Sequence, residues 1–325
     1  MAQTRMKTAS TPPYMYNDQP FPAVVENDLD LKDMQEVVTW LKTNRDDLES
    51  RLSKSGTVLF RGFPVNSPED FDRFIQALDY PNFAYEESLS NALRTNITER
   101  VFTANEAPPD VDIFLHHELA QTPLYPSRLL FYCDIAPDKG GATPLCRSDV
   151  LLERMWQELP DLTRKFADKG LRYTNVFAAD SDVSSGQGRS WKSLLNAQTN
   201  EEAETTLKKL GYDWEWLADD TLKITSPVLP AIKKTEDGRD VFFNQLIAAF
   251  RGWKDTRNDP SKAVTFGDGT PISKDDMQKV IDLSDELIYD LDWQKGDVAL
   301  VDNFLAMHGR KAFEGKRKVL ASLVA

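Results

Sequence analysis

The spacing of apolar residues along the chain predicts amphipathic helices. Between residues 31 and 54 apolar side chains recur at roughly helical spacing, and Gly56 follows as a stop signal. The segment 67–70 reads Ser-Pro-Glu-Asp, a capping box with proline at the first helical position. We therefore expect one helix over 31–54 and a second that begins after Ser67. Similar patterns predict helices at 148–160, 201–210 and 273–288.

Runs rich in β-branched and aromatic residues lie between these helices. The run 222–232 contains Pro227 and Pro230, which limits it to an edge or broken strand. The segment 257–270 is rich in Asp, Gly and Pro and is expected to be an irregular loop. The other predicted strands are 57–61, 113–115, 128–135, 241–244, 298–303 and 319–323. The order shows neither regular βαβ alternation nor a glycine-rich phosphate loop, which argues against a doubly wound nucleotide-binding fold.

Composition narrows the class of protein. The chain has 325 residues, of which 41% are hydrophobic and 28% charged, which excludes disorder, collagen and coiled coil as descriptions of the whole. Its formal net charge of −13 disfavours generic binding to nucleic acid or an anionic membrane. No apolar run approaches the ~18 residues of a membrane-spanning helix.

The N-terminal segment and the two cysteines bear on domain organisation and location. The first 16 residues contain no apolar core of a secretory signal, and we expect residues 1–25 to form a loose arm before a single domain at 26–325. Cys133 and Cys146 match no zinc or redox motif. We expect both to be reduced thiols in a cytoplasmic protein.

Histidine is scarce, which limits the choices for imidazole chemistry. The whole chain contains His116, His117 and His308. In an extended segment residues two apart share a face, so His116 and Glu118 can point at one atom while His117 points away. His308 is the remaining source of a second imidazole. Two histidines and one carboxylate that leave open positions are typical of non-haem Fe(II) oxygenases.

The triplet at 116–118 is weak by itself, because a structural histidine pair is equally consistent with it. We expect His117 to pack or hydrogen-bond behind the metal segment. Additional support comes from the residues around it. An iron site that uses 2-oxoglutarate needs a cation for the distal carboxylate, and the planar fork of arginine suits that task. Arg310 and Arg317 lie close to His308 in the sequence, and Thr143 adds a hydroxyl donor.

With these residues in view, the chain resembles the taurine dioxygenase and clavaminate synthase-like family of Fe(II)/2-oxoglutarate-dependent oxygenases, in particular the clavaminate synthase-like proteins of plants and fungi. The resemblance covers nearly the whole chain. It implies a mainly β fold, with a double-stranded β-helix (jelly-roll) core and helices packed outside. The segments that carry the resemblance are 56–63, 101–106, 114–120, 140–144, 263–269 and 296–323.

The resemblance also implies roles for individual residues. His116, Glu118 and His308 match the iron ligands of the family. Thr143 and Arg317 match the residues that bind the distal carboxylate of the cosubstrate. A shift of one residue would exchange Arg317 for Lys318, because neighbours on a strand face opposite ways. Some relatives hold an anionic substrate group with an arginine four residues later, where this chain has Ala321 or Ser322.

The implied activity consumes 2-oxoglutarate and O2 at Fe(II) and releases succinate and CO2. We expect oxidation of an unactivated C–H bond in a small polar substrate, a free amino acid or related carboxylate, by hydroxylation, desaturation or oxidative ring closure such as aziridine formation. A non-catalytic metal- or ligand-binding jelly-roll and a hydrolase with a metal-bound water are the alternatives. Candidate substrate contacts are Asn105, Glu106, Phe243, Asn244 and Arg310.

Overall fold

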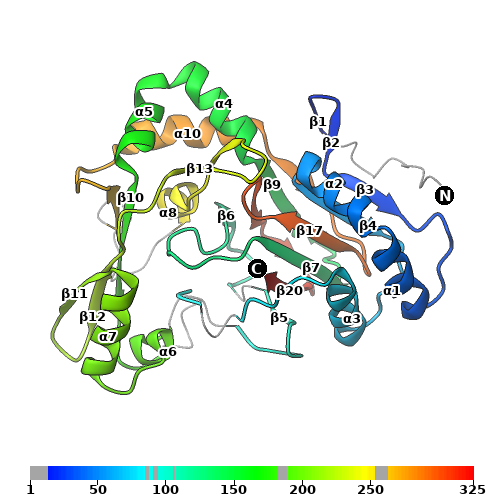
Figure 1. Ribbon diagram of the computed structural model, residues 1–325, viewed down its shortest axis with the longest axis horizontal. Helices are drawn as coiled ribbons and strands as arrows, with labels where there is room; N and C mark the ends of the chain where they lie inside the picture. The colour runs from blue at the N-terminus through cyan, green and yellow to red at the C-terminus, as the bar shows by residue number, and fades with distance from the viewer. Residues whose placement is uncertain (1–13, 85–87, 91–93, 105–106, 182–188, 253–262) are drawn as a thin grey trace.

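Two β-sheets form the centre of the molecule (Figure 1). The computed structural model describes residues 14–84, 88–90, 94–104, 107–181, 189–252 and 263–325. The larger sheet is antiparallel except for its β3–β4 pair, which is parallel. Its six strands, in spatial order, are β3 (Ala23–Glu26), β4 (Thr57–Arg61), β17 (Val298–Asp302), β7 (Arg128–Ile135), β20 (Lys318–Val324) and β5 (Phe102–Thr103).

The smaller sheet is antiparallel throughout and carries two of the three histidines. In its register His308 lies directly opposite His116, and the register shifts between His308 and Arg310. Apolar side chains from both sheets pack into one buried cluster, among them Leu145, Ala299 and Leu323. The four strands in order are β16 (Tyr289–Leu291), β9 (Thr143–Arg147), β18 (Ala306–Arg310) and β6 (Ile113–His116).

Three helices cover the other face of the larger sheet: α1 (Met34–Thr43), α2 (Arg45–Ser55) and α3 (Pro68–Leu78). Ser67 caps α3 as predicted, because its hydroxyl accepts the Asp70 amide N–H. The single helix expected over 31–54 is wrong, since the chain breaks at Asn44. The Asn44 side chain donates to the Trp40 carbonyl oxygen at 2.8 Å, which competes with continuation of the helical ladder.

A second group of helices packs against the smaller sheet. Apolar residues of these helices share a cluster with Leu115, Cys146 and Met307 of the sheet. Pro160 begins a new helix rather than only ending the preceding one. The helices are α4 (Ser148–Glu158), α5 (Pro160–Lys169), α8 (Leu246–Gly252) and α10 (Lys274–Glu286).

A third, outlying sheet lies on the left in Figure 1. It is built from β11 (Asp213–Trp216), β12 (Leu222–Thr225), β10 (Leu171–Phe177) and β15 (Val264–Phe266), with α6 (Trp191–Leu195) and α7 (Asn200–Leu210) beside it. Its β11–β12 end has a separate apolar cluster. The expectation of an irregular loop throughout 257–270 is wrong at Val264–Phe266, because these residues form β15. The strand expected over 222–232 ends at Thr225, before Pro227, and β13 (Ile232–Lys234) then pairs with β14 (Asp240–Phe242).

The expected loose arm over 1–25 is structured from residue 14 onward. Strands β1 (Tyr14–Tyr16) and β2 (Gln19–Phe21) form a hairpin, and β3 joins the larger sheet. Phe21 and Val24 are buried in the cluster between the two central sheets, so these residues belong to the folded body. Residues 1–13 lie outside the described part. One more short pair consists of β8 (Lys139–Gly140) and β19 (Phe313–Glu314).

The described chain is therefore a mixed structure of helices and sheets, and the expectation of a mainly β chain is corrected to that extent. The difference arises because amphipathic helices cover the outer faces of both central sheets. Within the described residues, none of the helices combines the length and apolar character needed to cross a membrane.

Candidate active site

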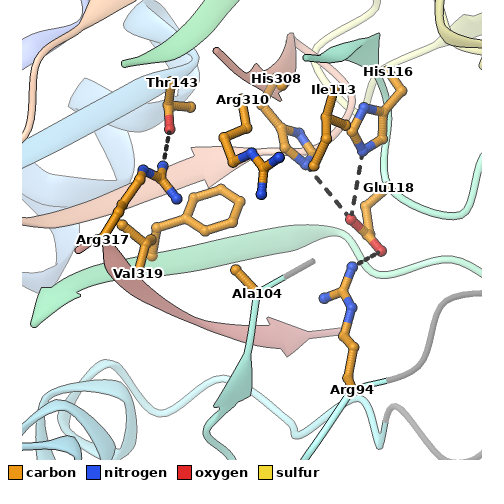
Figure 2. A pocket seen from close by; sticks show the side chains of 12 residues that line it. Arg94, Ala104, Ile113, His116, Glu118, Thr143, His308, Arg310, Arg317 and Val319 are labelled. Atoms are coloured by element: carbon orange, nitrogen blue, oxygen red, sulfur yellow. Dashed lines mark hydrogen bonds and ion pairs between the residues drawn. The ribbon is translucent and has the colours of Figure 1, made fainter. Parts of the chain in front are cut away.

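The two sheet histidines and Glu118 converge in one buried place. His116 ends β6, His308 lies within β18, and their ring centroids are 4.4 Å apart. Glu118 Oε2 lies 3.5 Å from His308 Nε2 and 4.0 Å from His116 Nε2 (Figure 2). One ligand atom from each residue lies within 4.8 Å of the others. The three side chains that the sequence analysis named as metal ligands therefore lie together in the folded chain.

The hydrogen bonding of His116 prepares its Nε2 atom to bind a metal. Nδ1 lies 2.8 Å from the Phe114 carbonyl oxygen, which can only accept, so Nδ1 carries the proton. Burial, and then the neighbouring His308, lower the pKa of His116 to about 4. The ring is therefore neutral at pH 7, and its Nε2 lone pair faces the carboxylate. A neutral imidazole held in this way is the usual form of a metal ligand.

Glu118 is held at both its backbone and its carboxylate. The Asn303 side chain binds the backbone N–H and C=O of Glu118, and Arg94 Nη2 lies 2.8 Å from Glu118 Oε1. Burial raises the pKa of Glu118, but Arg94 and then the imidazoles outweigh that effect and lower it to about 2. The carboxylate is therefore charged at neutral pH. Two imidazoles and a charged carboxylate in a buried cluster fit the donor set of a non-haem Fe(II) centre.

The pocket beside this cluster continues from the metal ligands to Thr143 and Arg317 (Figure 2). Its described lining brings together the predicted metal and cosubstrate residues, although they are far apart in the sequence. The residues that line it are Arg94, Ala104, Ile113, His116, Glu118, Phe131, Thr143, His308, Gly309, Arg310, Arg317 and Val319.

The far end of the pocket fits a carboxylate. Thr143 Oγ1 accepts from Trp293 Nε1 at 2.9 Å and from Arg317 Nη2 at 3.5 Å. Both partners are donors only, so the Thr143 hydroxyl proton must go to a different acceptor. Burial, and then Arg310, lower the pKa of Arg317 to about 10, which leaves the guanidinium charged at neutral pH. A charged donor and a hydroxyl proton side by side suit one carboxylate group.

The alternative register at β20 is not the one observed. Lys318 Nζ pairs with Asp134 Oδ2 at 2.9 Å, and the lysine side chain is 44% exposed. Lys318 is not among the described residues that line the pocket, whereas Arg317 is. Arg317 also donates from Nε to the Gly141 carbonyl oxygen at 2.9 Å. The glycine turn at Gly140–Gly141 therefore orients the arginine of this pocket.

Of the predicted substrate contacts that the structure describes, one lines the pocket and two do not. Arg310 lines the pocket, but its guanidinium donates to the backbone carbonyls of Ala107, Pro108 and Val111. Phe243 and Asn244 follow β14 rather than forming part of it, and neither is in the described lining. Phe243 packs on His117, and Asn244 caps the start of α8 by accepting the Leu246 N–H. Asn105 and Glu106 lie outside the described residues.

His117 faces away from the metal cluster, as expected. It is fully buried, with Nδ1 at the Asn303 carbonyl oxygen and Nε2 at 2.9 Å from Ser148 Oγ. Cys133 and Cys146 are both buried free thiols, which confirms that they do not pair with each other. Sequence reasoning missed Arg94, Asn303 and Trp293. Asn303 lies five residues before His308, within the segment 296–323 that carries the family resemblance, and that proximity was its one signal in the sequence. Arg94 and Trp293 resemble ordinary surface or packing residues and gave no signal.

Comparison with known proteins shows which family and which relatives the chain matches. The family model described as taurine catabolism dioxygenase TauD, TfdA family matches residues 17–323. A clavaminate synthase-like protein of Arabidopsis thaliana is 42% identical over 314 residues, covering 95% of this chain and 94% of the relative. Dapdiamide synthesis protein DdaC of Enterobacter agglomerans is 30% identical over 295 residues, covering 85% and 84%.

The fold is also shared with a solved structure. A putative alpha-ketoglutarate-dependent taurine dioxygenase from Burkholderia xenovorans aligns with a TM-score of 0.52 at 14% identity, covering 96% of this chain and 91% of the other. Together with the metal cluster, the match to the family model defines a non-haem Fe(II)- and 2-oxoglutarate-dependent dioxygenase. The chain belongs to the taurine catabolism dioxygenase TauD, TfdA family. Its cofactor is Fe(II), and its cosubstrates are 2-oxoglutarate and O2.

Proposed function

We propose that this dioxygenase oxidises an unactivated C–H bond of a small polar substrate, a free amino acid or a related carboxylate, and releases succinate and CO2. The observation that carries the proposal is a single pocket lined by three metal-binding side chains and by Arg317 and Thr143. A metal site and a carboxylate site in one chamber are what a 2-oxoglutarate-dependent reaction requires.

His116, Glu118 and His308 would hold the iron, which supplies the redox chemistry that couples O2 to oxidation of 2-oxoglutarate and substrate. The protein residues hold and orient the reactants. Arg317 and Thr143 would bind the distal carboxylate of 2-oxoglutarate, with Trp293 and the Gly141 carbonyl oxygen fixing their positions. Phe131 and Val319 add apolar side chains to the lining of the same pocket, where they would help to exclude water from the reaction.

We also propose that the two central sheets form a double-stranded β-helix. Their shared apolar cluster, the antiparallel pairing around β7 and β18, and the fold shared with the Burkholderia structure support this description. In such a core the two sheets face each other, and the pocket lies at β6, β9, β18 and β20, whose side chains line it.

The proposed substrate class is supported by the relative from Enterobacter, whose name assigns it to the synthesis of dapdiamide, and by the cationic lining of the pocket. The test is a screen of free amino acids and small carboxylates for succinate release, with Fe(II), 2-oxoglutarate and O2 present. Mass spectrometry would detect gain of an oxygen atom or loss of a hydrogen pair. Turnover of a free amino acid is expected. Coupled oxidation of uncharged substrates alone would contradict the proposed class.

A further inference from the structure

The indole N–H of Trp293 donates a hydrogen bond to Thr143 at the carboxylate end of the pocket. The distance from Nε1 to Thr143 Oγ1 is 2.9 Å, and both residues are buried. Thr143 is among the described residues that line the pocket, whereas Trp293 is not. The ring instead packs in the apolar cluster that the two central sheets share, which includes Leu145 and Leu291. Trp293 is thus linked to the pocket through the hydroxyl of Thr143.

This hydrogen bond determines how the Thr143 hydroxyl can act on a ligand. An indole N–H and a guanidinium N–H can only donate, and both Trp293 Nε1 and Arg317 Nη2 donate to Thr143 Oγ1 (Figure 2). A hydroxyl oxygen has two acceptor positions and one proton. With both acceptor positions used, the hydroxyl can offer a ligand in the pocket only its proton. A donor suits an ionised carboxylate, because that group can only accept.

The backbone around Trp293 is held by the buried ion pair between Arg61 and Asp297. Arg61 Nη2 lies 2.6 Å from Asp297 Oδ2 and 2.9 Å from the carbonyl oxygen of Asp292, the residue before Trp293. Asp297 Oδ2 also accepts the N–H of Gln294, the residue after Trp293, at 2.9 Å. The chain on both sides of the indole ring is therefore tied to one ion pair. This support leaves Nε1 little freedom to turn away from the hydroxyl.

We infer that Trp293 is a positioning residue that fixes the Thr143 hydroxyl as a hydrogen-bond donor to the distal carboxylate of 2-oxoglutarate. This inference rests on the proposed function, which assigns Thr143 and Arg317 to that carboxylate, and it names the group that orients one of them. Without the indole N–H, one acceptor position on Thr143 Oγ1 would be free. The hydroxyl proton could then turn away from the ligand, and part of its hydrogen bond would be lost.

The experiment is a double-mutant cycle on cosubstrate binding. Trp293→Phe keeps an aromatic ring but removes the N–H donor, and Thr143→Val removes the hydroxyl. The wild type, both single variants and the double variant are loaded with Mn(II) and titrated with 2-oxoglutarate by calorimetry, and their melting temperatures are measured. Trp293→Met, whose flexible side chain also lacks a donor, replaces Trp293→Phe in the cycle if that variant does not fold.

Trp191→Phe is the matched control for loss of a buried indole donor. Trp191 is fully buried, and its Nε1 donates to the Asp220 carbonyl oxygen at 2.9 Å. Neither residue belongs to the described lining of the pocket. Trp191→Phe should therefore lower the melting temperature and leave the affinity for 2-oxoglutarate unchanged.

Trp293→Phe should weaken 2-oxoglutarate binding by about three- to tenfold, as for one misdirected hydrogen bond. In the Thr143→Val background it should cause less than about a twofold further loss, because no hydroxyl is left to orient. Wild-type affinity in folded Trp293→Phe would overturn the inference. The same loss with and without the hydroxyl would also overturn it, because the ring would then act by packing. If 2-oxoglutarate does not bind the Mn(II)-loaded wild type, the proposed function has failed instead.

A second, independent observation concerns Asn303, which is fully buried behind the metal ligands. Its Oδ1 accepts the Glu118 N–H at 2.8 Å, and its Nδ2 donates to the Glu118 carbonyl oxygen at 3.0 Å and to that of Pro126 at 2.8 Å. The residue after Glu118, Leu119, has a φ of 59°, a left-handed conformation that a leucine rarely adopts. One amide therefore fixes a strained turn that aims Glu118.

We propose that Asn303 is a positioning residue for the metal ligand Glu118. Asn27 provides a matched control, because its side chain makes the same pattern of bonds to the backbone of Leu31 and to Gly62, away from the pocket. Asn303→Leu and Asn303→Asp are compared with Asn27→Leu and Asn27→Asp. Each variant is titrated with Mn(II) by calorimetry, and its melting temperature is measured.

Both pairs should lose melting temperature, but only the Asn303 variants should lose metal affinity, by about 10- to 100-fold. Asn303→Asp keeps the acceptor for the Glu118 N–H, so it gives the reading if Asn303→Leu does not fold. Wild-type Mn(II) affinity in a folded Asn303 variant would overturn the proposal. An equal loss of affinity in the Asn27 variants would also overturn it, because the effect would then follow general stability.

Discussion

Two hollows in this molecule contain clusters of charged side chains, and they differ in how those charges are arranged. One is the pocket at the metal ligands. The other, here called the second cavity, lies between α2, the β13–β14 hairpin and the segment after β17. In the second cavity Arg128 pairs with Glu49 at 3.2 Å, and the Arg239 guanidinium pairs with Asp237. Asp302 Oδ1 accepts the backbone N–H groups of Phe304 and Leu305.

Both arginines of the second cavity are thus paired with carboxylates of the protein itself. In the metal pocket one ligand atom from each of three residues lies within 4.8 Å of the others, and both hydrogen-bond partners of Thr143 Oγ1 are donors, so its hydroxyl proton is directed to another acceptor. Both hollows contain several ionic groups, so their number does not identify a binding site. Ligand atoms that converge on one position do. The predictions below compare changes in the metal pocket with changes outside it.

The largest effect is expected at His308. Replacing it with alanine removes one of the two imidazoles that face Glu118, so the remaining two ligands should not hold the iron in working geometry. Succinate release from 2-oxoglutarate should be abolished. The measurement is the rate of Fe(II)- and O2-dependent succinate formation, with the melting temperature as a check on folding. Retained turnover in a folded His308→Ala protein would remove His308 from the iron site.

The next effect concerns the carboxylate end of the pocket. Arg317→Ala should weaken 2-oxoglutarate binding by about 1.5–3 kcal/mol, or roughly 10- to 150-fold, because a charge-assisted hydrogen bond is lost. Lys318→Ala should change it little, since Lys318 pairs with Asp134 and is partly exposed. Calorimetry on the Mn(II)-loaded protein gives both constants. A larger loss in Lys318→Ala would show that the strand register is wrong.

A smaller effect is expected at Thr143. Thr143→Val keeps the shape but removes the hydroxyl proton proposed to reach 2-oxoglutarate, and it leaves Trp293 Nε1 without its acceptor. Binding of 2-oxoglutarate should weaken by about 1–2 kcal/mol, with a stability loss of similar size. Thr143→Ser retains the hydroxyl and should behave almost as the wild type in the same titration. Equal weakening in both variants would contradict a role for the hydroxyl.

The smallest effect is expected in the second cavity. Arg239 and Asp237 side chains are 31% and 43% exposed, so their ion pair is screened by solvent and contributes little. Arg239→Gln should cost at most about 1 kcal/mol in the free energy of unfolding, measured by denaturant titration. It should leave 2-oxoglutarate affinity at the wild-type value. A loss of affinity comparable with that of Arg317→Ala would remove the distinction between the two hollows.

Local patterns predicted much of this structure. The strands at 57–61 and 128–135 and the cap at Ser67 are confirmed, because short-range periodicity and capping chemistry determine them. The break at Asn44 was not predicted, because it depends on one side chain reaching back to a carbonyl oxygen. The strands before residue 26 were missed because their stability comes from burial of Phe21 and Val24 against distant strands.

The site was predictable where residue types are rare and was missed where common residues act through position. Three histidines leave few choices for a metal site, so His116 and His308 could be named from the sequence. Arg94 and Asn303 belong to residue types that usually lie on the surface or in turns. Their contacts with Glu118 span 24 and 185 positions of the chain and depend on the folded topology. Phe243 and Asn244 were named for the pocket, but they pack elsewhere.

The central claim is that His116, Glu118 and His308 hold one ferrous ion beside a site for 2-oxoglutarate. The most direct test is a visible absorption spectrum of the Fe(II)-loaded protein, recorded without oxygen, as 2-oxoglutarate is added. We predict a weak charge-transfer band that saturates with 2-oxoglutarate in the wild type and does not form in His308→Ala. Absence of the band in wild-type protein that binds both Fe(II) and 2-oxoglutarate would contradict the account.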